Sequence, residues 1–283
     1  MKKYALIGYP LGHSLSPNIH TRLLELSGIE GGYEKHEIPP ERLTESYDML
    51  GSLDGFNITI PHKIAIIDYC DELSEGANRY KSVNCVKNGE RKIGYNTDVL
   101  GFTKSIDMLG ASLSSKVLII GCGGVGRMIA IETALKGGDL TIAVLPMDMA
   151  NAESVKAEIA AAKPTAKINI VTIKGSNLSP SDFGGNVPEF DLLINASPVG
   201  MYPKVENCPC TEEIIDKVSY IFDVIYNPKD TLLSKTARSK GKKVMTGMAM
   251  LVLQAAAAHE IWNGSSFKEE DLKKLISDME ELV

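Results

Sequence analysis

Lys63 and Asp98 are two side chains in the first hundred residues that could together catalyse acid–base chemistry on an alcohol. Pro61 predicts that a helix begins just before Lys63, where the positive end of the helix dipole disfavours a cation. On its own segment, Lys63 is explained equally well as a solvated surface charge. If the two side chains converge, the carboxylate holds the ammonium in place while the helix dipole keeps its proton mobile. Reduction of a ketone needs such a proton donor.

Short polar side chains accompany this pair in the same part of the chain. Asn57 and Thr59 alternate with apolar residues along an expected strand, and Asn84 brings an amide into another. Ser14 and Ser16 place two hydroxyl groups near the expected start of a helix, where Ser16 is also explained as a simple N-cap. Alone, these groups do not identify a substrate.

The segment GCGGVG at 121–126 has the glycine spacing of a phosphate-binding turn. It directly follows the apolar stretch 117–120 and opens a helix that runs through Leu135. The first glycine allows a tight turn, the second lets the backbone approach a pyrophosphate, and the last permits close packing of helix on sheet. The helix N-terminus offers free N–H groups and a favourable dipole. The context predicts a dinucleotide-binding turn.

The residues that would contact the adenosine ribose follow the next expected strand, 140–145. NAD enzymes commonly place an acidic residue at this strand end, whereas NADP enzymes need a cation for the 2′-phosphate. No Arg or Lys occurs between Leu140 and Ala152. Asp139 precedes the strand, and Asp148 lies a few residues beyond its end. A helix start explains an acidic residue at 148 equally well. The segment therefore argues against tight 2′-phosphate binding more clearly than it argues for NAD.

Two successive patterns of elements must position these residues. In the first hundred residues short strands alternate with helices, and Asn88-Gly89 predicts a hairpin with a type I′ turn. The expected strands are 4–8, 33–38, 56–60, 82–87 and 92–95, and the expected helices are 19–26, 41–50 and one from Pro61. This part is expected to be an α/β domain with a mixed sheet.

From Lys116 onward apolar strands alternate regularly with helices, which is typical of a doubly wound parallel sheet. Strands are expected at 117–120, 140–145, 168–173, 191–194, 220–224 and 243–245, with a helix at 151–162, a surface connection at 175–188 and helical structure from 247 to 283. The predicted fold class is α/β: an N-terminal α/β domain followed by a Rossmann-type doubly wound parallel sheet.

Length and composition indicate a two-domain globular protein that handles small molecules. The 283 residues exceed one typical domain, and 44% hydrophobic with 23% charged residues are ordinary globular values. No apolar run approaches the roughly 18 residues that span a bilayer, and the N-terminal apolar stretch predicts a strand rather than a signal peptide. A net charge of −6 without basic blocks argues against nucleic acid and membrane partners.

Five scattered cysteines suit a reducing cytoplasm with free thiols better than a disulfide framework. Cys208-Pro209-Cys210 is the only tight pair, and no second Cys or His pair accompanies it at zinc spacing, so we interpret it as incidental. We therefore expect a cytoplasmic protein with no metal site.

Eight motifs follow one another in the order seen in a known family. They are SLSP at 14–17, NITIPHK at 57–63, SVN at 82–84, NTD at 96–98, GCGG at 121–124, INASPVGM at 194–201, DVIYNP at 223–228 and GMAMLVLQ at 247–254. Through them the sequence resembles the shikimate dehydrogenase family, which includes shikimate and quinate dehydrogenases, over nearly its full length.

The resemblance implies roles for individual residues. Lys63 and Asp98 match the family's acid–base pair. Positions that bind the substrate match Ser14, Ser16, Thr59, Asn84, Tyr226 and Gln254, and positions that bind the cofactor match Gly121, Gly123, Gly124, Val125 and Gly247. Several short polar groups of this kind suit a small polyhydroxy acid better than an apolar pocket does.

The resemblance also implies a domain arrangement and a reaction. Residues 1–102 and 247–283 would form the substrate-binding domain, residues 103–246 the NAD(P)-binding domain, and the substrate would lie between them. The implied reaction is reversible reduction of 3-dehydroshikimate to shikimate by NADPH or NADH, in a monomer or homodimer whose partners are small molecules rather than nucleic acid or membrane.

Departures from the family pattern keep two alternatives open. Members that use NADP typically carry Asn-Arg-Thr or Asn-Arg-Lys where this chain has Val144-Leu145-Pro146, so the basic clamp is absent. Milder changes occur at Cys85, Val99 and Ala249. One alternative is an NAD-dependent dehydrogenase that acts on a related hydroxy acid such as quinate. The other is a protein that senses a shikimate-like acid without turning it over.

Overall fold

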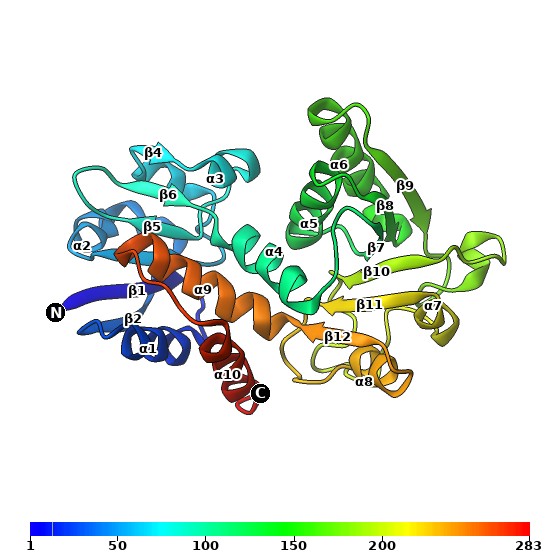
Figure 1. The fold of residues 1–283 in the computed structure, drawn as a ribbon. Helices are drawn as coiled ribbons and strands as arrows, with labels where there is room; N and C mark the ends of the chain where they lie inside the picture. Colours follow the sequence, from blue (N-terminus) through cyan, green and yellow to red (C-terminus); the bar gives the residue numbers. More distant parts are fainter. Residues whose placement is uncertain (13) are drawn as a thin grey trace. The chain divides into compact units, whose positions relative to one another are not determined.

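A computed structural model describes residues 1–12 and 14–283 of the chain, which form two compact units (Figure 1). Unit 1 comprises Met1–Gly101 and Leu251–Leu282, and unit 2 comprises Phe102–Met250 with Val283. The chain passes from one unit to the other within helix α4 (Thr97–Leu109) and returns within helix α9 (Gly247–Asn263). No helix among the described residues is both long enough and apolar enough to cross a membrane.

Unit 1 is built on a mixed six-stranded sheet in the order β2-β1-β3-β5-β6-β4. Its strands are β1 (Lys2–Gly8), β2 (Gly31–Glu37), β3 (Gly55–Ile58), β4 (Glu72–Leu73), β5 (Cys85–Lys87) and β6 (Ile93–Tyr95). Strand β1 runs parallel to both β2 and β3, whereas β5 runs antiparallel to β3 and to β6. The mixed sheet predicted for this part of the chain is confirmed.

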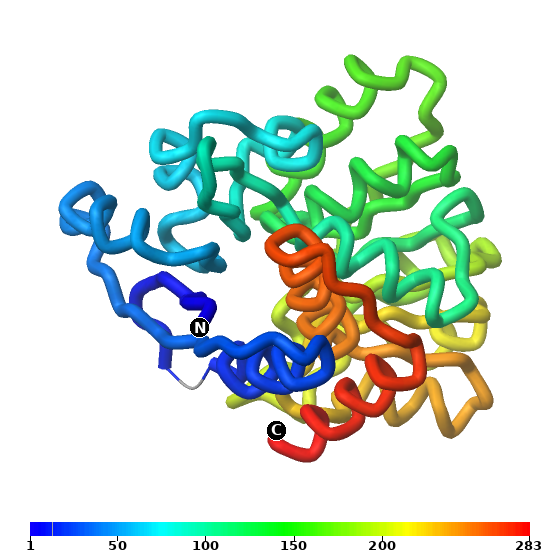
Figure 2. The backbone as a smooth tube through the Cα atoms, turned by 60° about the vertical axis from the view of Figure 1, so that its left-hand side comes forward, coloured from blue at the N-terminus to red at the C-terminus, as the bar shows by residue number. Residues whose placement is uncertain are grey.

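Both faces of this sheet are covered, because alternate residues of β1 enter different cores. Ala5 and Ile7 pack in one cluster with residues of β3 and the segments that follow it, while Tyr4 and Leu6 pack in another with Trp262 of α9. The remaining helices are α1 (Ser16–Ser27), α2 (Tyr47–Gly51), α3 (Glu75–Tyr80) and α10 (Glu269–Glu280). Helices α1 and α10, near the two ends of the chain, lie side by side (Figure 2).

Three local predictions in unit 1 are wrong. The helix expected at 41–50 is two short 3₁₀ turns, Pro40–Arg42 and Thr44–Ser46, followed by α2. The hairpin of β5 and β6 exists, but Lys87 pairs with Ile93, so five residues connect the strands instead of a two-residue type I′ turn. The third error, the helix expected from Pro61, lies at the candidate site.

Unit 2 contains a parallel six-stranded sheet in the order β12-β11-β10-β7-β8-β9. Its strands are β7 (Lys116–Ile120), β8 (Asp139–Val144), β9 (Lys167–Thr172), β10 (Phe190–Asn195), β11 (Val218–Asp223) and β12 (Lys243–Thr246), and its helices include α5 (Gly124–Leu135), α6 (Met149–Ala162), α7 (Glu212–Asp216) and α8 (Leu232–Ser239). This is the doubly wound order, which confirms the predicted fold class. Ligands of such sheets bind at the carboxyl ends of the strands where the order reverses, here β7 and β10.

The apolar strands of unit 2 explain why its sheet is parallel. β7, β8 and β10 read almost continuously apolar, and their residues after the first are buried, apart from Asp191 in β10. Strands of this kind need cover on both faces, which helices in crossover connections provide. The Gly175–Pro188 connection contains a 3₁₀ turn at Pro180–Phe183.

Candidate active site

One edge of the sheet in unit 1 collects the polar residues singled out in the sequence. Strands β1 and β3 are parallel, so their carboxyl ends meet at this edge, and β5 begins there because Asn57 of β3 pairs with Cys85. Strand β6 ends there, because Tyr95 pairs with Cys85. Thr59, Asn84 and Asp98 lie within three residues of these strand ends, and the connections after β1 and β3 contain Ser14, Ser16 and Lys63.

The Lys63 ammonium and the Asp98 carboxylate form an ion pair, with Nζ 2.7 Å from Oδ2. The other carboxylate oxygen, Oδ1, accepts a hydrogen bond of 2.8 Å from the Asn84 amide. The Lys63 side chain is 29% exposed and the Asp98 side chain 22%. Partly solvated pairs contribute only about 0–1 kcal/mol to stability, so the consequence of this pair is geometric. It holds a proton donor at one place on the sheet edge.

Lys63 lies in a turn, and the prediction that an α-helix begins at Pro61 is wrong. The regular structure that follows is a 3₁₀ helix at Ala65–Tyr69, which starts after Lys63. The Lys63 carbonyl accepts a hydrogen bond of 2.8 Å from the Val83 amide, which ties the turn to the segment before β5. A helix dipole therefore does not act on Lys63 as expected. The acidic residue at a helix start is instead Asp98, in the first turn of α4.

Asn84, Thr97 and Gln254 form a buried polar network behind the ion pair. Asn84 Oδ1 accepts a hydrogen bond of 2.7 Å from the Thr97 amide and lies 3.2 Å from the Thr97 hydroxyl. Gln254 Oε1 lies 3.1 Å from that hydroxyl and 3.4 Å from Asn84 Nδ2. The single hydroxyl proton of Thr97 can serve only one of its two acceptors at a time.

Thr97 is a functional candidate that the sequence pattern did not single out. Its side chain is fully buried, whereas Asn84 and Gln254 keep 3% and 9% of their surface exposed. It links an amide before β5 to an amide of α9, and it directly precedes Asp98 in the chain. The sequence feature that could have identified Thr97 is its place between Asn96 and Asp98 in a polar motif.

Ser14 and Ser16 follow β1 and Thr59 directly follows β3, the two strands whose carboxyl ends meet at this edge. The two serine oxygens lie 3.1 Å apart, and the Ser16 amide donates a hydrogen bond of 3.2 Å to Ser14 Oγ. Ser16 is the first residue of α1 and not its N-cap, which is Leu15. The Thr59 hydroxyl has no hydrogen-bond partner within residues 1–12 and 14–283, so it is available to a ligand.

The glycine turn of unit 2 has the backbone features predicted for a phosphate cradle. Gly121 has a φ of +96°, and a Cβ there would lie 2.9 Å from the carbonyl oxygen of Ala196. A Cβ on Gly126 would lie 2.6 Å from the carbonyl oxygen of Gly121. Gly123 and Gly124 instead face open space, where a Cβ would meet no protein atom within 4 Å. The first and last glycines therefore serve packing, and the middle pair leaves room for a ligand.

The N-terminus of α5 completes this cradle. Helix α5 begins at Gly124, and Val125 in its first turn is 39% exposed. No side chain caps this helix end, which leaves its first N–H groups facing outward. A diphosphate with two negative charges fits such a donor set.

Tyr226 and Gly247 follow β11 and β12 at the carboxyl edge of the parallel sheet. Tyr226 is 40% exposed, so its ring is accessible. Gly247 is the first residue of α9, and a Cβ there would lie only 1.9 Å from the carbonyl oxygen of Val224. A glycine is therefore required at 247 for packing, whatever else the position does. Both residues belong to unit 2, whereas the Lys63–Asp98 pair belongs to unit 1.

A buried carboxylate supports the loops at this edge and was also missed by sequence reasoning. Asp223, the last residue of β11, accepts hydrogen bonds from the Thr231 hydroxyl at 2.6 Å and from the Asn195 amide at 3.0 Å. Burial raises the pKa of Asp223 to about 6, although these hydrogen bonds oppose the rise. Asn195 Oδ1 in turn accepts from the amide and hydroxyl of Ser197. The network fixes the segments that leave β10 and β11.

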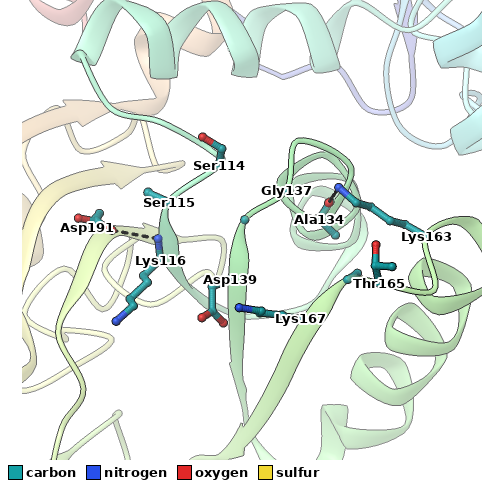
Figure 3. A pocket seen from close by; sticks show the side chains of 12 residues that line it. Ser114, Ser115, Lys116, Ala134, Gly137, Asp139, Lys163, Thr165, Lys167 and Asp191 are labelled. Atoms are coloured by element: carbon teal, nitrogen blue, oxygen red, sulfur yellow. Dashed lines mark hydrogen bonds between the residues drawn. The ribbon is translucent and has the colours of Figure 1, made fainter.

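A pocket of about 480 Å³ lies at the opposite, amino edge of the same sheet (Figure 3). The first residues of β7, β8 and β9, which are Lys116, Asp139 and Lys167, line it. Lys163 donates hydrogen bonds of 3.0 and 3.1 Å to carbonyl oxygens at the end of α5. The Lys163 ammonium complements the negative end of the α5 dipole, so its contacts are explained by the fold. The described residues contain no group of three or more acidic, His or Cys side chains arranged to hold a metal.

Comparison with known proteins places the chain among its relatives. Residues 6–86 match the family model of the shikimate dehydrogenase substrate binding domain. The chain is 36% identical over 274 residues to the shikimate dehydrogenase (NADP(+)) of Caldanaerobacter subterraneus subsp. tengcongensis, in an alignment that covers 95% of this chain and 94% of that protein.

Two solved structures are similar over almost the whole chain. Shikimate 5-dehydrogenase from Thermus thermophilus, in complex with NADP(H) and shikimate, gives a TM-score of 0.82 at 29% identity, covering 98% of this chain and 99% of that one. The Listeria monocytogenes shikimate 5-dehydrogenase, in complex with shikimate and NAD, gives a TM-score of 0.85 at 27% identity, covering 98% of this chain and 96% of that one.

Proposed function

The chain belongs to the shikimate dehydrogenase family, as its eight motifs predicted, and we propose on this basis that it reduces 3-dehydroshikimate reversibly to shikimate with a nicotinamide dinucleotide. The observation that carries the proposal is the Lys63–Asp98 pair at 2.7 Å, surrounded by short polar side chains on one sheet edge. An oxidoreductase that acts on a CH–OH group needs a proton donor and acceptor in such surroundings.

Lys63 acts as the acid–base residue. In the reductive direction its ammonium donates a proton to the oxygen of the substrate carbonyl as that oxygen gains negative charge, and in the oxidative direction its amine takes the proton back. Asp98 holds Nζ in position through Oδ2. Asn84 holds the carboxylate through Oδ1, so that the carboxylate cannot rotate away from the lysine.

The substrate's hydroxyl and carboxylate groups are recognised by Ser14, Ser16, Thr59, Asn84, Gln254 and Tyr226. Support comes from Thr59 and Asn84, which adjoin strand ends at one sheet edge, and from the Thr59 hydroxyl, which has no partner in the described part of the chain. A site built from hydrogen-bonding groups discriminates strongly against analogues that lack the matching hydroxyl, because its polar groups are then left unpaired.

The dinucleotide is held by Gly121, Gly123, Gly124 and Val125 at the start of α5, with Gly247 at the start of α9. The open space over the middle glycines and the uncapped helix N-terminus fit a diphosphate. When bound, the nicotinamide supplies or accepts the hydride. We further expect a cytoplasmic monomer or homodimer whose partners are these small molecules.

The test uses purified full-length protein with shikimate and either NAD⁺ or NADP⁺, followed at the absorbance of the reduced nicotinamide. We expect turnover with at least one dinucleotide and weaker or no turnover of quinate. Lys63→Ala lowers kcat by roughly 10²–10⁴-fold, the usual contribution of a general acid–base group.

The matched control is Lys2→Ala, because Lys2 forms an ion pair of the same 2.7 Å length with Asp54 at the opposite end of β1. This variant should keep its activity. A wild-type protein that binds shikimate but turns over neither shikimate nor quinate would contradict the proposal and favour a non-catalytic ligand sensor.

A further inference from the structure

We propose that this chain selects NAD⁺ over NADP⁺, with the Asp148 carboxylate facing the adenosine ribose and excluding a 2′-phosphate. The inference rests on the proposed use of a nicotinamide dinucleotide and adds which of the two is bound. Its basis is the charge and exposure of the segment that follows β8.

The segment after β8 lies next to the glycine turn. Strands β7 and β8 are parallel neighbours in which Ile120 pairs with Ala143, and the Gly121 amide donates a hydrogen bond of 2.9 Å to the Ala143 carbonyl. The chain leaves β8 at Val144 and enters a 3₁₀ turn, Pro146–Asp148, before α6. In doubly wound folds the adenosine ribose binds at this strand end.

This strand end presents apolar surface and one negative charge. Leu145 and Met147 are 37% and 82% exposed. Asp148 occupies the N-cap position of α6, yet its side chain makes no capping hydrogen bond and has no other hydrogen-bond partner among the described residues. The thiol of Cys122, inside the glycine turn, has a pKa raised first by burial and further by the Asp148 charge. The Asp148 charge therefore lies close enough to the glycine turn to act on it electrostatically.

Arg127, a cation of the helix that follows the glycine turn, is already paired with a carboxylate. Arg127 of α5 donates two hydrogen bonds, at 2.9 and 2.5 Å, to the Glu158 carboxylate of α6. Lys174, which follows β9, donates a backbone hydrogen bond of 3.1 Å to Asp182. Burial opposes the shift, but the hydrogen bonds that this carboxyl accepts, and last the Lys174 charge, lower the pKa of Asp182. A 2′-phosphate adds about two negative charges. It would meet the Asp148 charge with Arg127 already paired to Glu158. A ribose 2′-hydroxyl, by contrast, can donate a hydrogen bond to the Asp148 carboxylate.

Calorimetric titration with NAD⁺ and with NADP⁺, in the absence of substrate, tests the proposal. We expect NAD⁺ to bind at least tenfold more tightly. Equal or tighter binding of NADP⁺ would overturn this inference while leaving the dehydrogenase function intact. Binding of neither dinucleotide would overturn both this inference and the cofactor part of the proposed function.

Two variants locate the selectivity. Leu145→Arg places a cation at the strand end and should raise NADP⁺ affinity at least tenfold while changing NAD⁺ affinity less than threefold. Asp148→Asn removes the negative charge and should narrow the preference for NAD⁺ severalfold. The matched control is Asp139→Asn, because Asp139 begins the same strand at the opposite edge of the sheet (Figure 3). An equal effect of Asp139→Asn and Asp148→Asn would overturn the assignment to Asp148.

Discussion

At the scale of single residues, the position of the Lys63 ammonium depends on the side chains of Asp98 and Asn84. Asp98 contacts Lys63 with one carboxylate oxygen and Asn84 with the other. Asn84 is itself held by the Thr97 amide at 2.7 Å and is buried. A chain of short hydrogen bonds therefore runs from the backbone at the start of α4 to the ammonium. Such supporting contacts keep a catalytic group within the narrow range of useful geometries.

Thr97 is the residue at which this arrangement is tested most cleanly. Thr97→Val keeps the side chain's shape but removes the hydroxyl shared by Asn84 and Gln254, so we expect KM for shikimate to rise about tenfold and kcat to fall by less. Thr97→Ser keeps the hydroxyl and should restore KM to near the wild-type value. Steady-state kinetics measures both constants. A purely structural role would instead lower thermal stability in both variants and leave KM unchanged.

A second group of buried residues, away from the ion pair, makes the stability of unit 1 depend on pH. His20 Nδ1 lies 3.1 Å from His259 Nε2, and the rings pack among Tyr4, Tyr33 and Trp262. Burial lowers the pKa of His259 to about 4, and burial followed by repulsion from His259 lowers the pKa of His20 well below 6.5. Between pH 4 and 6.5 the unfolded state therefore binds more protons, and stability falls as the pH drops through this window.

His259→Gln should reduce that dependence. The shift of the His259 pKa from 6.5 to about 4 corresponds to roughly 3 kcal/mol of unfolding free energy. Urea unfolding at about pH 7.5 and about pH 4.5, followed by the fluorescence of Trp262, the single tryptophan, measures it. The pKa of Asp223 is raised, so this residue acts with the opposite sign: its contribution to the stability of the folded protein falls as the pH rises from about 4 to 6. Asp223 is present in both wild type and variant, so its contribution cancels in the comparison. Identical pH dependence in wild type and variant would contradict the prediction.

At the scale of elements, close approaches of backbone decide where helices can begin. Helix α9 begins at Gly247 directly against the end of β11, with the Gly247 amide donating a 3.1 Å hydrogen bond to the Ile225 carbonyl. Helix α5 begins beside the glycine turn, where Gly126 packs on the Gly121 carbonyl. Glycine at these two positions lets α9 and α5 each start close to the carboxyl end of a strand.

Gly247→Ala should destabilise the protein by at least about 3 kcal/mol, because its Cβ would lie 1.9 Å from the Val224 carbonyl oxygen and backbone cannot yield cheaply. The control is Gly32→Ala in β2, where a Cβ meets nothing within 4 Å and the change should stay within about 1 kcal/mol. Thermal and urea unfolding of both variants provide the measurement. Equal stabilities would mean that α9 can shift freely.

At the scale of the whole molecule, the two ligands are expected to act on different units. The Lys63–Asp98 ion pair and most of its polar neighbours belong to unit 1, whereas the glycine turn belongs to unit 2. The chain crosses between the units within two helices, α4 and α9. Asp98 lies at the start of α4 and Gln254 within α9, so each crossing helix carries a residue of the candidate site.

Hydrogen exchange with each ligand alone should reveal this division. NAD⁺ should slow exchange of the amides from Gly121 to Arg127, and shikimate should slow those around Asn84 and Thr97. At a ligand concentration of about 100 Kd the bound state gains roughly 2.7 kcal/mol, enough to slow exchange through the affected openings about a hundredfold. Protection by NAD⁺ confined to unit 1 would contradict the assignment of the turn.

Features with local causes could be predicted from residue order alone. Continuous apolar strands followed by helices predicted the parallel sheet, and the glycine spacing after the first of them predicted the turn, because both depend on neighbours a few residues away. Local pattern failed at 41–50 and at Pro61. At both places the chain forms 3₁₀ turns, which a proline or an apolar pattern does not distinguish from an α-helix.

Which polar residues meet was settled by the folded chain. Lys63 and Asp98 are 35 positions apart, and Asn84 reaches Gln254 across 170 positions. Periodicity carries no information over such distances; strand order does, because β3, β5 and β6 place their ends at one edge. Thr97 gained its role only when α9 brought Gln254 within 3.1 Å of its hydroxyl. The chemistry of the site was encoded in residue types, and its geometry arose from the pairing of distant strands.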